Sequence, residues 1–464
     1  MSKAGMLLIG MLLPLWMLGQ YNMGVGNSNY AGIQGALINP AGLAGSKLRW
    51  DLNGLSMGVL FDNNFVYVPK GAVPAFGFRA IIEGIIHEDK FATHFDRGNP
   101  NKLYNFTFSN EILGPSFQLA LDDQQTIGLT IASRSYVSIR DLPGHTAQNA
   151  YDYLLTPSRW HIPYSDHSSR LNGMSWLEYG FHYAAVLSDD GTNKWKGGIT
   201  LKYLQGVAAA YVKNTNLNYT IADTTGLVFT GSSVDYGRTD YDSYRKINGY
   251  GDLNHGGGVG ASLGIVYVHA TDTRKEDDYQ YRIGLSLLDI GAIHFSRNTA
   301  AYHLQTGNAN FSDWRQVTLK SNVAIDRTLS AVFYQGDSSR SKVSDGFTMR
   351  MPTTLSLQAD WKVRDNYFLN ATIVKGIGPG HGQAAVQPDI YAITPRYEKR
   401  EWEVSLPLSL VYYGQWRARL GIAARVWYFF FGGDAPFGLL GRSNMQGVDF
   451  YAGVHFFLPT TKTK

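Results

Sequence analysis

Residues 126–140 read TIGLTIASRSYVSIR, and this stretch alternates between apolar and polar side chains. Its odd positions include Ile127, Leu129 and Ile131, whereas its even positions include Thr130 and Arg134. Because successive side chains of a β-strand point to opposite faces, the alternation indicates a strand between an apolar and a wet environment. The same alternation recurs in residues 279–286, 355–363, 402–412 and 416–427.

Segments of this kind extend along the whole chain. We count 12 of them, at residues 50–68, 113–121, 126–140, 176–187, 195–211, 259–270, 279–294, 355–363, 367–375, 401–413, 416–430 and 447–458. Residues 216–222 and 301–306 could raise the number to 14. Short polar turns join pairs of strands, and long polar connections separate the pairs, at residues 81–110, 141–172, 214–254, 296–350, 376–400 and 431–446.

This asymmetry of short turns and long loops is typical of outer-membrane barrels, with the long loops outside the cell. We therefore predict an all-β fold, a transmembrane antiparallel β-barrel of 12–14 strands with long extracellular loops over residues 48–464. A large soluble β-sandwich or secreted adhesin would alternate as well. The membrane is favoured by a polar face rich in charge, by an aromatic last strand, and by aromatic residues near strand ends, namely Trp176, Trp195, Trp361, Tyr367, Trp402, Tyr413 and Trp416.

Composition and the N-terminus fit the same class. The chain has 464 residues and a formal net charge of +4, too close to balance to suggest nucleic acid, and it has no cysteine for disulfides or thiolate metal sites. Lys3 and the apolar residues 5–18 predict a signal peptide at residues 1–19. An uncleaved anchor is the alternative, but the run is shorter than the roughly 20 residues that a spanning helix needs. We expect the protein in the outer membrane of a Gram-negative cell, surrounded by lipid.

Residues 32–43 read GIQGALINPAGL, directly before the first expected strand. The string Asn39-Pro40-Ala41-Gly42-Leu43 resembles the N-terminal signature of FadL-type outer-membrane barrels, which include long-chain fatty-acid transporters and PorV-type relatives that serve protein secretion. The strings RWDLN at residues 49–53 and MPTTL at residues 351–355 look more like a Bacteroidota barrel group of unknown function.

The resemblance implies that residues 20–47 fold into the lumen as a hatch, with Asn39, Pro40 and Ala41 as gating candidates. The alternative is that these residues only cap a short helix before the first strand. The implied function is a conduit for small, possibly hydrophobic, molecules. A non-catalytic accessory barrel that holds partner proteins in a secretion or assembly complex is the second hypothesis, and both rest on analogy.

Charged residues on the polar face are the most informative candidates for a function inside the barrel. By strand parity we expect these to point into the lumen: Arg134, Arg140, Glu178, Lys196, Lys202, Arg282, Asp360, Lys362, Glu403, Arg417, Arg419 and Arg425. Basic residues outnumber acidic ones in this set, and a basic lumen could select anions. A mutually paired network that rigidifies a plugged barrel is the preferred interpretation. A largely polar lumen would also leave little apolar track for a fatty acid.

Catalytic, cofactor and metal sites are not expected, and we predict that the chain is not an enzyme. The strings HGGG at residues 255–258 and GASLG at residues 260–264 have hydrolase spacing, but both lie in one strand-like segment, where a nucleophile elbow needs a strand–turn–helix. His161, Asp166 and His167 share one loop and His182 lies elsewhere, so exposed polar residues explain them better than a metal site. Residues 141–156 could hold a short helix, and residues 329–334 a helix or an extra strand.

Overall fold

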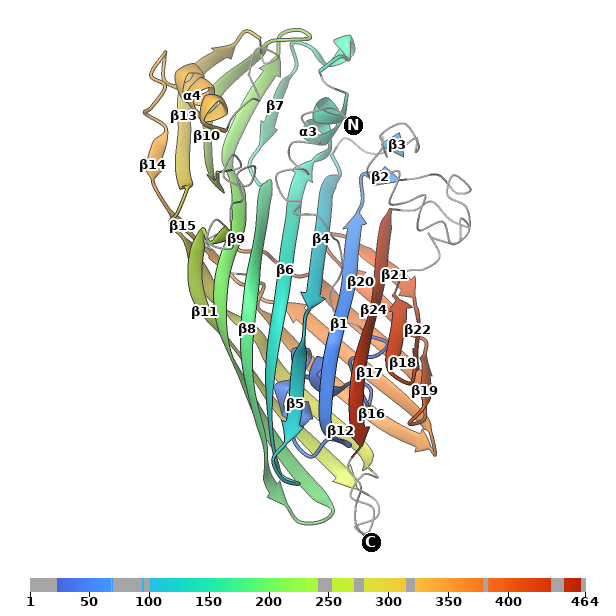
Figure 1. Cartoon of the computed structure of the whole chain (residues 1–464). Coiled ribbons are helices and arrows are strands. Elements are labelled where there is room, and N and C mark those ends of the chain that lie inside the picture. The colour runs from blue at the N-terminus through green and yellow to red at the C-terminus, as the bar shows by residue number, and fades with distance from the viewer. Residues whose placement is uncertain are drawn as a thin grey trace.

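The computed structural model describes residues 23–67, 69, 94–95, 101–152, 154–240, 253–270, 279–313, 322–378, 383–434 and 446–459. The expected signal peptide at residues 1–19 lies outside this part of the chain and stays a prediction. The strands close into an antiparallel barrel of 14 strands, which confirms the predicted fold class (Figure 1). No helix of the described residues is long and apolar enough to span a membrane.

Fourteen strand positions follow one another around the wall, and four of them consist of two strands in line. They are β1 (Leu48–Asn63), β4 (Leu103–Leu113) with β5 (Ser116–Ala120), β6 (Gln125–Pro143), β8 (Arg170–Asp189), β9 (Asn193–Ile221), β11 (Gly256–Ala270), β12 (Tyr279–Phe295), β15 (Phe347–Arg350) with β16 (Thr354–Arg364), β17 (Tyr367–Gly376), β18 (Asp389–Glu398), β19 (Trp402–Ser405) with β20 (Leu408–Tyr412), β21 (Trp416–Leu420) with β22 (Ile422–Val426), β23 (Phe429–Gly433) and β24 (Gly447–Pro459). β24 pairs with β1 from Leu48↔Pro459 to Asp62↔Gly447 and so closes the barrel.

A small sheet projects above the barrel at the end that carries the long loops (upper left in Figure 1). The upper part of β9 continues out of the wall and pairs with β7 (Pro163–Asp166) and β10 (Leu227–Thr239); β10 pairs with β13 (Thr299–Phe311), and β13 with β14 (Lys342–Ser344). Helix α4 (Asn322–Phe333) packs on this sheet, where Phe333 lies 5.1 Å from Phe229 between ring centroids. The remaining elements are α3 (Gly144–Tyr151), η3 (Pro157–Arg159) and the hairpin of β2 (Val66–Tyr67) and β3 (His94–Phe95).

The number of strands falls at the upper end of the predicted range, but two of them are not the ones expected. Residues 216–222 lie largely in the projecting end of β9, and residues 301–306 lie in β13, so neither adds a strand to the closed wall. Two strands of the wall were not predicted from the sequence. They are β18, which lies inside the expected loop 376–400, and β23, which runs from the end of the expected strand 416–430 into the expected loop 431–446. β18 accommodates Pro395 because this residue lies opposite the interruption between β19 and β20, where its carbonyl accepts the N–H of Leu406.

β18 changes which end of the barrel carries the next turn. Because β18 precedes it, the short turn at Gly414 and Gln415 between β20 and β21 lies at the loop end, whereas the sequence-based prediction placed all short turns at the opposite end. A Cβ on Gly414 would come within 2.2 Å of Asn105 Nδ2, near the start of β4 at the loop end. The helix expected within residues 141–156 is α3, and residues 329–334 fall in and just beyond α4.

The two faces of the wall differ as the alternation predicts. In β6, Leu129 and Ile131 on the outer face are each 46% exposed, whereas Arg134 on the inner face is 6% exposed. Aromatic rings border this apolar outer surface at the short-turn end, where Tyr397 lies between Tyr367, which it meets edge to face, and Trp402, with ring centroids 4.7 and 4.8 Å apart. Such a surface is poorly suited to water and matches the lipid-facing band of a membrane barrel.

If this apolar outer surface, here called the belt, faces lipid, the cost of a charge on it depends on how deep the charge lies in the membrane. Leu357→Arg places a charge in the middle of the band on β16 and is expected to destabilise the folded barrel by about 2–4 kcal/mol, because lipid does not solvate the charge. Val363→Arg is the matched control on the same face of the same strand, beyond Trp361, and is expected to cost about 0–1 kcal/mol. Denaturant unfolding in lipid vesicles measures both. Equal costs would contradict the assignment of the belt to lipid.

Candidate functional site: the hatch and the lumen

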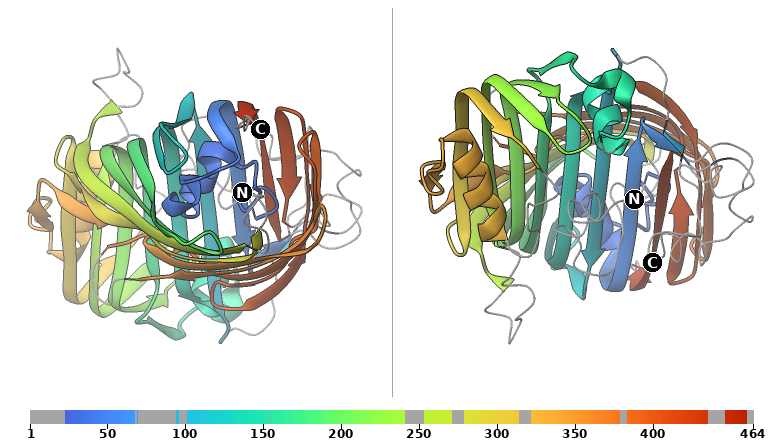
Figure 2. Two further views of the ribbon diagram at one scale, coloured as in Figure 1. Left: turned by 90° about the horizontal axis from the view of Figure 1, so that it is seen from below. Right: turned by 90° about the horizontal axis from the view of Figure 1, so that it is seen from above.

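The N-terminal segment of residues 23–47, here called the hatch, lies inside the ring of strands (Figures 1 and 2). It contains two short helices, η1 (Gly32–Leu37) and η2 (Pro40–Leu43). Ile33 and Leu43 are almost completely buried against Leu113, Ala132 and Ala184 of the wall. The hatch is therefore a packed plug at the short-turn end of the lumen.

Asn39 caps η2 and also contacts the wall, while its gating role stays a prediction. Its Oδ1 accepts the N–H of Ala41 at 3.0 Å, which caps η2 in the usual way. Its Nδ2 donates to Oε1 of Gln358 at 3.0 Å and to the carbonyl of Ile265 at 3.3 Å, so the same side chain bonds the hatch to β16 and β11. The Asn39 side chain therefore caps η2 with one atom and docks the hatch on the wall with the other.

Three glycines on neighbouring strands make room for this contact. A Cβ on Gly264 of β11 would lie 2.0 Å from Asn39 Oδ1, one on Gly198 of β9 would lie 2.4 Å from the backbone N of Ala41, and one on Gly284 of β12 would lie 2.8 Å from Asn39 Nδ2. Real Cβ atoms essentially never come this close, so Asn39, Pro40 and Ala41 occupy a recess that only glycine permits. We call Gly198, Gly264 and Gly284 the glycine recess.

Carboxylates of the wall hold the first part of the hatch. Ser28 Oγ donates to Glu403 at 2.6 Å, and Asn29 Nδ2 donates to Glu398 at 2.8 Å. Arg282 donates to the carbonyl of Asn27 at 2.5 Å. Each partner is a charged group, and hydrogen bonds to charged groups are among the stronger ones in proteins.

Asp51 of β1 holds the start of η1. Its Oδ2 accepts the N–H of Ile33 at 3.0 Å, while its Oδ1 lies 2.8 Å from Nδ1 of His455 on β24. Gly32 has a φ of +60° and its Cβ would lie 2.3 Å from the carboxyl carbon of Asp51, so glycine is required there by backbone and space alike.

Arg134 and Lys202 form the first charged cluster of the lumen. The Arg134 guanidinium lies 3.1 Å from Glu111, 3.1 Å from Glu178 and 2.9 Å from Asp289. Lys202 lies 2.7 Å from Glu178 and 2.5 Å from Asp289. Sequence reasoning missed Glu111, which precedes the expected strand, and Asp289, whose φ of 55° breaks the alternation of β12.

Asp360 and Arg396 form the second cluster, beside the hatch. Asp360 lies 3.2 Å from both Arg282 and Arg396, and Arg396 lies 2.9 Å from Glu398. Arg425 lies 3.4 Å from Glu403, the carboxylate that also binds Ser28. Arg396 and Glu398 were missed because they belong to β18, which was expected to be loop.

The remaining predicted charges are also bound. Arg417 lies 2.7 Å from Asp62, and Arg419 pairs with the same carboxylate near the loop end. Lys362 lies 3.3 Å from Asp365 in the turn after β16, and Lys196 donates to the carbonyl of Gly45 at 3.4 Å. The basic excess of the sequence-based set is therefore offset by acidic partners that the set lacked, as the paired-network interpretation expects.

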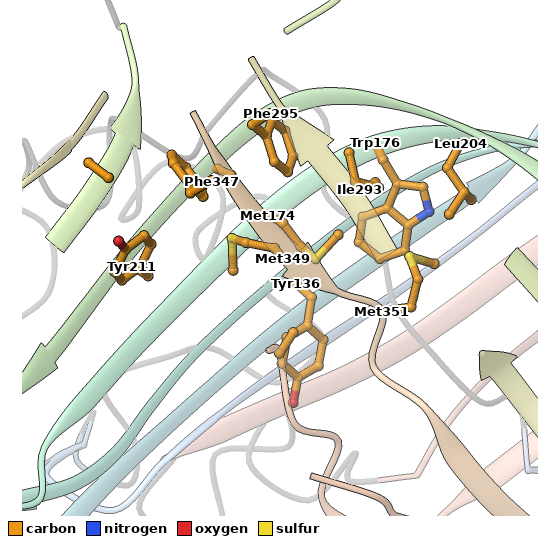
Figure 3. Packing of buried hydrophobic residues seen from close by; sticks show 13 residues of the cluster. Tyr136, Met174, Trp176, Leu204, Tyr211, Ile293, Phe295, Phe347, Met349 and Met351 are labelled. Atoms are coloured by element: carbon orange, nitrogen blue, oxygen red, sulfur yellow. The ribbon is translucent and has the colours of Figure 1, made fainter. Parts of the chain in front are cut away.

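An apolar cluster fills the lumen above the charged layer, where the sequence predicted a largely polar space. Tyr136, Met174 and Trp176 from β6 and β8 face Phe295 of β12 and Met349 of β15 (Figure 3). The full cluster is Tyr136, Met174, Trp176, Leu204, Ala209, Tyr211, Ile293, Phe295, Ala301, Phe347, Met349, Met351 and Ala385.

Two aromatic residues expected at the membrane interface lie inside the barrel instead. Trp176 is 1% exposed and its Nε1 donates to Glu178 at 3.2 Å, and Tyr413 is 0% exposed and donates to Asp62 at 2.9 Å. Tyr413 lies directly after β20, near a strand end as expected, whereas Trp176 lies well within β8, which begins at Arg170 and not at residue 176; both side chains take the inner face.

Residues 383–388 fold inward over the apolar cluster. Val386 accepts hydrogen bonds at its carbonyl from Tyr136 Oη and, at 3.2 Å, from Arg140 Nη2. Ala385 belongs to the cluster and Gln387 is 2% exposed. This segment, here called the strap, covers the lumen from the loop end as the hatch does from the other.

A cavity of about 220 Å³ lies between the hatch and the wall. It is lined by hatch residues between Gly26 and Lys47, by the turn that joins β8 to β9, and by side chains of β11, β12, β16 and β17. Both acidic and basic groups reach its surface.

The motifs set aside as chance matches have ordinary places in the fold. Ser262 of the GASLG string lies within β11, where its Oγ accepts the N–H of Asp289 at 3.1 Å. His161 and His167 are exposed, but Asp166 is not: it is 1% exposed and accepts from Asn214 at 2.8 Å. His182 is likewise buried, between Thr130 and Thr200 at 3.0 and 2.9 Å. Across the described residues, no three His, Asp or Glu side chains are grouped to hold a metal ion.

Comparison with known proteins gives a family and several distant structural likenesses. A family described as a family of unknown function, DUF5723, matches residues 75–434. No curated protein matches the chain. The TodX deltaS2S3 mutant monoaromatic hydrocarbon channel is 8% identical with a TM-score of 0.46, over 96% of this chain and 97% of that one.

Two further solved structures are similar to this chain at an equally low sequence identity. The Pseudomonas putida toluene transporter TodX is 8% identical, with a TM-score of 0.37 over 95% of this chain and 94% of that one. A Pseudomonas aeruginosa FadL homologue is 10% identical, with a TM-score of 0.32 over 96% and 99%. FadL-type channels are thus among the similar structures, but likenesses at this identity and TM-score establish no shared substrate or role. Membership of a Bacteroidota group stays a prediction.

Proposed function

Because this chain belongs to DUF5723, a family of unknown function, we propose its role from its own geometry: a non-catalytic outer-membrane conduit for small apolar molecules, closed at rest by its hatch. The closed barrel and its apolar outer belt support the membrane location, since a closed barrel pairs every backbone group within lipid. The expected signal peptide supports the outer membrane.

The glycine recess is the observation that carries the proposal. A plug that only filled space would need no more than apolar packing, such as that of Ile33 and Leu43. Here Gly198, Gly264 and Gly284 shape the wall for Asn39, Pro40 and Ala41, while Asp51, Glu398 and Glu403 bind the rest of the hatch by hydrogen bonds. Such polar contacts can be exchanged for water, so they suit a segment that docks and undocks.

The apolar cluster supports an apolar cargo. The charges of the lumen are bound to one another, so they offer little free charge to select an ion. Above them the cluster offers aromatic and thioether side chains, and methionine adapts its shape to varied apolar ligands. An apolar molecule would enter beneath the strap and leave past the hatch.

The proposal is tested by gentle extraction of the protein and mass spectrometry of what remains bound. We expect a small apolar molecule with the wild type and its loss in Ala385→Asp, which adds a charge to the cluster from the strap and leaves the strands unchanged. A stoichiometric protein partner without any small molecule would contradict the conduit. That result would favour the accessory barrel, with the projecting sheet of β7, β10, β13 and β14 as its contact surface.

A further inference from the structure

The strap presents two chemically different groups to the wall of the lumen. Ala385 places its methyl group in the apolar cluster, where the residue is 1% exposed. One residue further on, the carbonyl of Val386 accepts hydrogen bonds from Tyr136 Oη and, at 3.2 Å, from Arg140 Nη2. An apolar group and a carbonyl oxygen that is bound by two donors are therefore neighbours in the strap.

Both donors come from β6, at the edge of the apolar cluster. Tyr136 is 1% exposed, its ring belongs to the cluster, and its hydroxyl points away from Trp176 and Phe295 (Figure 3). Arg140 lies four residues further along the strand, so strand alternation places its side chain on the same inner face. β6 thus offers two hydrogen-bond donors directly beside an apolar surface.

The two donors meet at a single oxygen atom. A carbonyl oxygen has two lone pairs, so one such atom can accept from a phenol hydroxyl and from a guanidinium together. Arginine commonly binds a carboxylate through two parallel hydrogen bonds to its two oxygens. Here Arg140 donates to Val386 through Nη2, and the second donor is Tyr136. The arrangement therefore matches a neutral carbonyl group.

Entry of cargo separates the strap from these donors. In the proposed conduit the cargo lies against the apolar cluster beneath the strap, where Ala385 lies at rest. Tyr136 Oη and Arg140 Nη2 then lose the Val386 carbonyl. A donor left without an acceptor in a buried place costs free energy, because it has given up water and gained no partner. Cargo that carries an oxygen at this place avoids the cost, and a pure hydrocarbon does not.

We infer that, at rest, the strap occupies the place where cargo binds, and that the preferred cargo is an apolar molecule bearing one carbonyl oxygen, such as a ketone or an ester. The Val386 carbonyl stands for the oxygen of the cargo, and the Ala385 methyl group stands for its apolar body. Tyr136 and Arg140 are then the residues that determine specificity. This inference rests on the proposed conduit function and names the class of its cargo.

Tyr136→Phe removes one of the two donors and keeps the ring in the cluster. The strap keeps a separate anchor in this variant, because the N–H of Arg350 at the end of β15 donates to the carbonyl of Gln383 at 3.0 Å. The variant is therefore expected to fold with a closed barrel. Tyr211→Phe is the matched control, since Tyr211 of β9 belongs to the same cluster and packs on Phe347 with ring centroids 5.2 Å apart.

Equilibrium dialysis of the full chain in detergent measures the binding, with protein-free micelles as the reference for partition into detergent. The probes are 2-hexanone and 2-methyl-1-hexene, which have nearly the same shape but carry an oxygen and a CH₂ group, respectively, at the same position. We expect the ratio of ketone to alkene affinity to fall about tenfold or more from the wild type to Tyr136→Phe, because the alkene leaves the Tyr136 hydroxyl without an acceptor in the wild type alone. The ratio cancels the strap's own loss of this bond, which is the same for both probes.

The ratio is expected to stay unchanged in Tyr211→Phe. A fall of equal size in both variants, or an unchanged ratio in Tyr136→Phe, would overturn the inference. Tighter binding of hexanoate than of 2-hexanone to the wild type would also overturn it, because the donors would then serve a carboxylate. If neither neutral probe binds the wild type, the proposal of an apolar cargo fails together with the inference. Binding of both probes with an unchanged ratio in Tyr136→Phe counts against the inference alone.

Discussion

Arg134→Met is expected to lower the free energy of unfolding of the barrel by about 3–5 kcal/mol, the usual cost of removing one partner from a buried ionic cluster. Arg134 is 6% exposed and contacts Glu111, Glu178 and Asp289 on three separate strands. Without it only Lys202 faces the latter two carboxylates, and Glu111 keeps no cation at comparable distance in the described structure. Denaturant unfolding of the protein folded into vesicles measures the loss.

Lys375→Met is the matched control for this prediction. Lys375 also pairs with a carboxylate, Asp389, but its side chain is 57% exposed, and exposed pairs contribute about 0–1 kcal/mol. A similar loss in both variants would mean that the lumen cluster is hydrated like the surface. The account of a dry, paired charged layer would then fail.

Gly264→Val is expected to force the hatch out of its recess while the wall stays closed. A Cβ at this position would lie 2.0 Å from Asn39 Oδ1, and the backbone does not adopt a conformation that requires glycine, so the clash falls on the hatch contact. In an Ala44→Cys background, where the side chain is 0% exposed and packed against the wall while the hatch is docked, we expect labelling by maleimide to accelerate about tenfold or more, since docking bonds of about 1 kcal/mol or more are lost at Asn39.

Gly257→Val in the same strand is the control. Gly257 of β11 would place its Cβ no nearer than 3.9 Å to any neighbour, the Leu204 carbonyl, and it does not face the hatch. Labelling in this variant should match that of the parent. If Gly264→Val left labelling unchanged in a folded barrel, the glycine recess would not hold the hatch.

Much of the wall could be read from the sequence because a membrane barrel imposes one rule at every strand. Lipid requires an apolar outer face, and the lumen takes the polar residues, so parity alone placed Arg134, Glu178 and Lys202 on the inner face. These three residues come from neighbouring strands, and the structure brings them within one cluster.

The parts of the wall and lumen that were not predicted depend on local irregularities of the strands, which odd–even alternation does not reveal. β18 lay within the expected loop 376–400, so Arg396 and Glu398 were missed with it, although Tyr391 and Ile393 alternate with inward residues. In β12, Asp289 at φ 55° and Gly291 at φ 152° shift the register, which turns Ile293 and Phe295 into the lumen and builds the apolar cluster.

The hatch contact required knowledge of register across strands. Gly198 and Gly264 are two of 51 glycines and are unrelated in sequence spacing. Only the pairing of β9 with β11 places them opposite each other, and the pairing of β11 with β12 brings Gly284 opposite Val266. The Asn39-Pro40-Ala41 string marked the segment that docks, but not the surface that receives it.

Uptake of an apolar naphthylamine dye by Gram-negative cells tests the hatch-gated conduit most directly, because an intact outer membrane excludes such dyes. We predict faster uptake with Gly264→Val than with the wild type, and loss of that increase when Ala385→Asp is added, since the dye must cross the apolar cluster. Uptake that is the same in wild type and Gly264→Val, or that persists in the double variant, would contradict the account.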